Sequence, residues 1–128
     1  MISQADVCQI AILWTNVKKN ILDYANISND TKYYIGEKCV FITSTFYSET
    51  YKKNVLYTSV LDIYDNGDVI SDCEEFLYED APYLNTLTHN TPIGVYKNNT
   101  FHLSVCKKNY DLVCEMVGNI DNIVMWKY

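Results

Sequence analysis

Apolar side chains recur at three- and four-residue spacing over residues 3–24, which predicts a long N-terminal helix. The members of this stripe are Val7, Ile10, Ala11, Trp14, Val17, Ile21 and Leu22. Ile12 and Leu13 widen it, so we expect the helix to be buried on more than one side. Ser3 is placed to cap its N-terminus, with Asp6 completing a capping box. The polar side is expected to carry Lys18, Lys19 and Asp23.

The next part of the chain alternates between two sets of side chains, as strands do. After a polar turn, a strand is predicted over residues 33–46, and a second one over 54–64. The pair Asn66-Gly67 then supplies the positive φ angles of a tight hairpin turn. We therefore expect the return strand to begin at Val69.

The second half begins with an acidic stretch over residues 72–80, which predicts a short helix that Pro82 stops. Residues 83–91 favour neither helix nor strand. Residues 93–96 and 101–106 predict a second hairpin, because a short polar turn separates two apolar runs. The residues expected to face the core from it are Phe101, Leu103 and Val105, with His102 and Ser104 opposite.

A C-terminal helix is predicted over residues 110–126, with Asn109 as its N-cap. Its apolar face consists of Leu112, Val113, Met116, Val117, Ile120, Ile123 and Val124. Gly118 interrupts this face at a cost of roughly 1 kcal/mol relative to Ala, unless it permits close packing against the sheet.

This order of elements predicts a single α+β domain over residues 1–128, in which a mostly antiparallel sheet packs against the N- and C-terminal helices. A length of 128 residues fits one domain. The 48% of hydrophobic and 20% of charged residues are typical of an ordered core and exclude a low-complexity chain.

Charge narrows the classes of function. The chain has 16 acidic and 10 basic residues, for a net charge of −6, and every basic residue is a lysine. Nucleic-acid binding is disfavoured, because such proteins gather positive charge on one face. An arginine clamp on phosphate or carboxylate cannot occur within this chain. The abundance of Asn, Ile, Lys and Tyr indicates an AT-rich genome, such as that of a large DNA virus or a low-GC bacterium.

The N-terminus lacks the basic start and apolar run of a signal peptide, and no segment approaches about 18 continuous apolar residues. We therefore expect a cytoplasmic protein without a membrane partner. Its five cysteines include no C-x-x-C pair and are expected to be free thiols that act as small buried hydrophobes. We expect no metal and no cofactor.

Candidate catalytic residues are few. The segment starting at Asp62 has Tyr64 and Cys73 where a calcium loop needs oxygen ligands. His102 and Cys106 share a predicted strand face, but four strand residues span roughly 13 Å, too far for a catalytic pair. A pairing of Cys39 or Cys73 with His89 stays open.

The candidate binding residues are five carboxylates in nine positions, Asp72, Glu74, Glu75, Glu79 and Asp80. They form either a solvated surface or an electrostatic docking surface for a basic partner. Twelve tyrosines are too many to bury in a domain of this size, and tyrosine is enriched at interfaces.

The sequence favours a non-enzymatic protein-binding module, an adaptor, inhibitor or chaperone of viral or bacterial origin, which binds a protein partner through an exposed tyrosine-rich and acidic surface. The alternatives are a small enzyme that uses Cys, His or carboxylates, and a small-ligand-binding cup between sheet and helix. A homodimer through an apolar or tyrosine-bearing surface also stays open.

Overall fold

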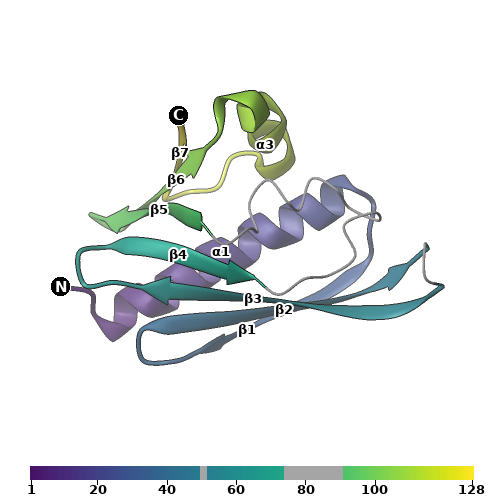
Figure 1. The fold of residues 1–128 in the computed structure, drawn as a ribbon, viewed down its shortest axis with the longest axis horizontal. Helices are drawn as coiled ribbons and strands as arrows, with labels where there is room; N and C mark the ends of the chain where they lie inside the picture. Colours follow the sequence, from purple (N-terminus) through teal and green to yellow (C-terminus); the bar gives the residue numbers. More distant parts are fainter. Residues whose placement is uncertain (50–51, 74–90) are drawn as a thin grey trace.

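The computed structural model describes residues 1–49, 52–73 and 91–128, and these form a single α+β domain (Figure 1). The helical elements are α1 (Gln4–Tyr24), a 3₁₀ turn (Lys107–Asn109) and α3 (Tyr110–Val117). The strands are β1 (Asn29–Ile35), β2 (Cys39–Ser48), β3 (Lys53–Ile63), β4 (Asp68–Cys73), β5 (Thr91–Lys97), β6 (Thr100–Val105) and β7 (Ile123–Lys127).

Within the described residues these strands make one seven-stranded sheet in chain order, from β1 at one edge to β7 at the other. All neighbours are antiparallel except β6 and β7, which are parallel and are joined through α3. The predicted fold class, a mostly antiparallel sheet with an N-terminal and a C-terminal helix, is therefore confirmed. No helix in the described ranges is long and apolar enough to cross a membrane.

Helix α1 forms where the apolar stripe predicted it. The Ser3 side chain accepts from the Asp6 backbone N–H and the Asp6 carboxylate accepts from the Ser3 backbone N–H, which completes the capping box. All seven stripe residues and Leu13 are buried, whereas Ile12 is exposed. Lys18 was expected on the polar side but is buried, and its ammonium group lies over the Trp14 ring, 5.1 Å from the centroid.

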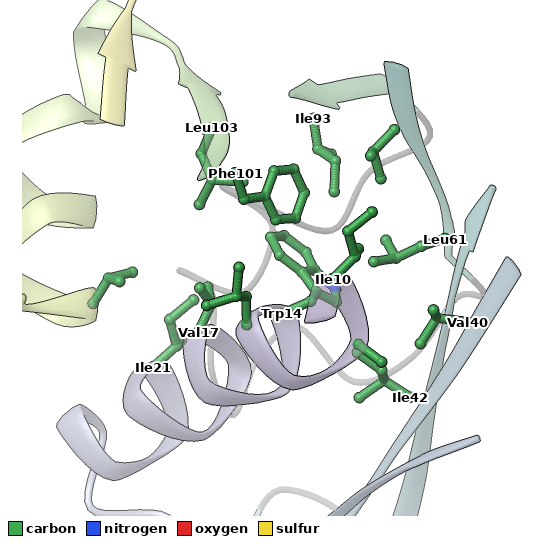
Figure 2. Close-up of a cluster of buried hydrophobic side chains, with 14 of the residues drawn as sticks. Ile10, Trp14, Val17, Ile21, Val40, Ile42, Leu61, Ile93, Phe101 and Leu103 are labelled. Atoms are coloured by element: carbon green, nitrogen blue, oxygen red, sulfur yellow. The ribbon is translucent and has the colours of Figure 1, made fainter. Parts of the chain in front are cut away.

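The sheet curves around α1, so side chains from distant strands meet on the helix (Figure 2). Val40, Ile42 and Leu61 approach from β2 and β3, while Phe101 and Leu103 approach from β6. Trp14 is the largest fully buried side chain, and its ring centroid lies 6.2 Å from that of Phe101. These side chains form the hydrophobic core between α1 and the sheet.

The strand predicted over residues 33–46 is in fact the hairpin β1–β2. Gly36 donates its backbone N–H to the carbonyl of Cys39 at 2.9 Å, and the two strands pair in unbroken register from Asn29–Phe46 to Ile35–Val40. The residues on both sides of this turn favour strands, so the alternation of side chains alone did not indicate that a turn divides the segment.

Two other predicted hairpins are confirmed. In the β3–β4 turn only Gly67 has a positive φ, of 95°, and Gly67 donates its N–H to the Tyr64 carbonyl at 2.9 Å. This is a turn closed by one left-handed residue rather than by two. The β5–β6 turn does use two, because Asn98 and Asn99 have φ of 52° and 60°.

The helix predicted over residues 110–126 is wrong beyond Val117. Gly118 ends α3 with φ of 68° and ψ of −158°, and β7 follows, paired in parallel with β6. A Cβ at Gly118 would meet nothing within 4 Å, so this glycine supplies a backbone turn and not close packing. Asn109 makes no side-chain cap, and Ile120 is only half-buried. The sheet edge offered by β6 overrides the helical periodicity.

The acidic helix predicted over residues 72–80 begins too early, because Asp72 and Cys73 are the last residues of β4. Their backbones pair with Val60 and Ser59 of β3. Strand pairing against β3 decides the conformation of these two positions. Residues 74–90, which include the rest of that prediction and the ambiguous segment after it, lie outside the described residues.

Candidate protein-binding surface

Of the five carboxylate residues of the predicted acidic site, the structure describes only the backbone of Asp72. Asp72 stands opposite Val60 in the β3–β4 register. The other four carboxylates, Glu74, Glu75, Glu79 and Asp80, lie outside the described residues. The docking role of this run therefore stays a prediction.

The expectation that many tyrosines are exposed is confirmed for the side chains that the structure describes. The exposed ones are Tyr24, Tyr33, Tyr34, Tyr47, Tyr64 and Tyr128. Tyr33 and Tyr34 are neighbours on β1, and Tyr47 lies at the far end of β2. The strands β1 and β2 thus carry three of the phenol rings that face solvent.

On the face of the sheet turned away from α1, an apolar row crosses three strands. Tyr34 pairs with Phe41, and Phe41 pairs with Val60, so the three side chains are cross-strand neighbours. Tyr34 is 55% exposed and Phe41 42% exposed, while Val60 is half-buried. We call these three residues the outer row. It was missed at the sequence level because residues 26 positions apart come together only through the strand register.

Both polar and apolar side chains lie around the outer row on the same face of the sheet. The next cross-strand row is polar and consists of Lys32, Thr43 and Thr58. Beyond it Leu56, 61% exposed, stands opposite Thr45. The backbone position of Asp72 follows Val60 in the register, so the first residue of the predicted acidic run adjoins the outer row.

A groove of about 450 Å³ lies between α1 and β1. Its lining residues are Thr15, Asn16 and Lys19 from the helix and Thr31, Lys32, Tyr33 and Tyr34 from the strand. Two hydroxyls of the groove already have hydrogen-bond partners: Thr15 donates to the Ala11 carbonyl at 2.7 Å, and the Thr31 and Ser44 hydroxyls are 2.9 Å apart. Tyr34 belongs to both the groove and the outer row, so the two features form one continuous surface.

At the opposite end of α1, a polar network fixes the helix to the β5–β6 turn. Tyr96 donates its hydroxyl to Gln9 at 2.8 Å, and Gln9 donates to the Asn99 carbonyl at 3.2 Å. Burial raises the pKa of the Tyr96 phenol, and the nearby carboxylate of Asp6 raises it further. These contacts join the N-terminal half of α1 to β5 and the β5–β6 turn.

The residues considered for catalysis are not assembled into a reactive pair in the described ranges. The His102 ring stacks edge-on against Trp126, with centroids 5.6 Å apart, and Cys106 follows the end of β6, exposed to solvent. His89 lies outside the described residues. Among the residues whose placement is described, no cluster of three His, Cys, Asp or Glu side chains could hold a metal ion.

The expectation that the cysteines are buried is wrong for those whose side chains are described. Cys106 is exposed, and Cys8, Cys39 and Cys114 are half-buried, although all four are free thiols. Cys39 lies on the solvent face of β2, opposite Asp62, because the neighbouring Val40 occupies the core face. Apolar character alone did not predict which face each thiol takes.

Comparisons with models of protein families, with curated proteins and with solved structures find no match for this chain.

Proposed function

We propose that this protein is a non-enzymatic protein-binding module of the adaptor, inhibitor or chaperone kind, and that it binds a protein partner through the outer row and the surface around it. The observation that carries the proposal is the exposed cross-strand pair Tyr34–Phe41, on the sheet face opposite α1. Aromatic side chains supply large contact areas and are enriched at interface centres.

The arrangement of charge around the outer row supports this proposal. Lys32 lies in the next row on the same face, and Asp62 lies in the row on the other side, opposite Cys39. An apolar centre with a charged rim is the usual anatomy of a protein interface. The aromatic centre supplies affinity, while the rim charges tune the association rate.

The acidic run from Asp72 to Asp80 is proposed to steer a basic part of the partner toward this surface, since Asp72 adjoins the outer row in the register. Neutralising Glu74, Glu75 and Glu79 should then slow association and leave dissociation nearly unchanged. We place the protein in the cytoplasm, where its free thiols would stay reduced. The net charge of −6 disfavours a nucleic acid as the partner.

The proposal is tested with two matched double variants on the same face of the sheet. Tyr34→Ser with Phe41→Ser removes the aromatic centre of the outer row. Val124→Ser with Trp126→Ser removes two comparably exposed apolar side chains of β7. Each protein serves as bait in extracts of native host cells, with quantitative mass spectrometry as the readout and circular dichroism as the folding control.

Proteins retained by the wild type should be lost with the β1–β2 variant and kept with the β7 variant. Equal retention by both folded variants would show that the outer row is not the binding surface.

A further inference from the structure

In the part of the chain that the structure describes, the strand β1 is an edge of the sheet. Gly36 and Cys39 form a hydrogen-bonded pair at the turn of the β1–β2 hairpin. From there, hydrogen-bonded and non-hydrogen-bonded residue pairs alternate along the two antiparallel strands. The backbone groups of Tyr34, Lys32 and Asp30 therefore point toward β2. Those of Thr31, Tyr33 and Ile35 point away from the sheet, where the described part of the chain provides no further strand.

β1 lacks three of the features that can block strand addition. Natural edges are protected by proline, by bulges or by very short strands. β1 has seven residues, contains no proline and pairs with β2 in an unbroken register. The backbone N–H and C=O groups of its single lysine, Lys32, point toward β2. The outward N–H and C=O groups of three alternate residues thus form a template for another strand.

The groove beside this edge has the opposite charge to the chain as a whole. Its seven lining residues include Lys19 and Lys32 and no carboxylate, although acidic residues outnumber lysines by 16 to 10 in the sequence. Asp30 pairs with Lys32 at 3.4 Å, and both side chains are more than 60% exposed, so this pair can exchange for another carboxylate at little cost. Lys19 is exposed on the helix side.

We propose that an extended acidic segment of the partner protein adds to the β1 edge as a further strand and lies in the α1–β1 groove. This inference rests on the proposed function and names the partner's chemistry. In an added strand, alternate side chains point to opposite faces, so carboxylates at every second position would all face the helix side and Lys19. The backbone bonds to Thr31, Tyr33 and Ile35 would fix the register.

A second copy of this chain fits the edge less well. Each copy carries a net charge of −6, which opposes self-association, and its own β1 contributes only one carboxylate, Asp30. A foreign strand with several carboxylates on its helix side complements Lys19 better.

The test uses the full chain and fluorescein-labelled heptapeptides measured by fluorescence anisotropy. The probe peptide has the sequence Thr-Glu-Val-Glu-Val-Glu-Thr, and two control peptides carry Gln or Lys in place of every Glu. We expect the Glu peptide to bind, the Gln peptide to bind about threefold to tenfold more weakly, and the Lys peptide weakest of all. Binding of the Glu peptide should weaken as salt is raised.

Three protein variants separate the backbone from the side chains. Tyr33→Pro removes one outward N–H without touching the β2 pairing, and should weaken the Glu peptide at least tenfold. Tyr33→Ala keeps that N–H, so it should weaken the peptide less. Met125→Pro makes the corresponding change on the other sheet edge, β7, and should leave the affinity unchanged.

Equal binding of the Glu and Lys peptides, no binding of the Glu peptide at about 1 mM protein, or equal effects of the two proline variants would overturn the inference. A concentration-dependent dimer that Tyr33→Pro dissolves would assign the edge to a second copy and also overturn it. If the peptides fail while the outer-row variant still loses the native partner, the proposed function stands and only this inference fails.

Discussion

Replacing Gly67 by Ala tests how tightly the β3–β4 turn is held against β5. Gly67 has φ of 95°, and its carbonyl accepts the Tyr96 backbone N–H at 2.8 Å. A Cβ at this position would overlap the carbonyl oxygen of Tyr96. That oxygen cannot move aside freely, because Tyr96 also pairs with Phe101 in the β5–β6 register.

The expected destabilisation has two parts. A positive φ costs an L-residue about 1–2 kcal/mol. Forcing a methyl group against fixed backbone costs about 1–3 kcal/mol more. The Gly67→Ala variant should therefore lose about 2–5 kcal/mol of unfolding free energy, measured by urea denaturation followed by circular dichroism.

Gly36→Ala is the matched control in the β1–β2 turn. Its φ is not positive, and the atom that a Cβ would meet first is the Cys39 sulfur, which can rotate away. We expect a loss of less than about 1 kcal/mol there. If the two variants were equally stable, the packing of the β3–β4 turn on β5 would be wrong.

Three further predictions follow from single groups. A thiol reagent should label Cys106 before the half-buried Cys8, Cys39 and Cys114, and Cys106→Ser should remove the fastest labelling phase; unchanged kinetics would contradict the exposed position. Burial raises the Tyr96 pKa above 10.0, so its contribution to stability is complete below that pH and is lost as the pH rises through the folded-state pKa. Urea titrations should show a smaller loss of stability above pH 10 in Tyr96→Phe than in the wild type, and parallel pH profiles would argue against the burial. Asn99→Gly should raise the melting temperature, because glycine adopts the positive φ of 60° at no steric cost, and a lower melting temperature would refute the turn assignment.

Local chemistry explains which parts of the fold the sequence predicts. Helix α1 follows from a stripe that one helix face can satisfy by itself, and its capping box involves residues three positions apart. The β5–β6 turn follows from Asn98-Asn99, since asparagine tolerates positive φ better than most residues. Such features depend on neighbouring residues alone, so they can be predicted without knowing how the rest of the chain folds.

The failures involve contacts that the local hydrophobic pattern does not reveal. Residues 123–127 have helical spacing but become β7, because β6 offers a pairing edge that an isolated sequence pattern does not reveal. Lys18 is buried with its ammonium group over the Trp14 ring, a contact within α1 that the apolar stripe did not indicate. The outer row depends on the register of three strands, so Tyr34, Phe41 and Val60 could not be grouped from their positions alone.

Photo-crosslinking in native host cells tests the proposed binding surface most directly. Benzoylphenylalanine replaces Tyr34, which belongs to both the outer row and the groove, or Trp126, which is as exposed but lies on β7. The account predicts a discrete crosslinked protein from position 34 and none from position 126. A crosslink from position 126 alone would place the partner at the opposite edge of the sheet and contradict the account.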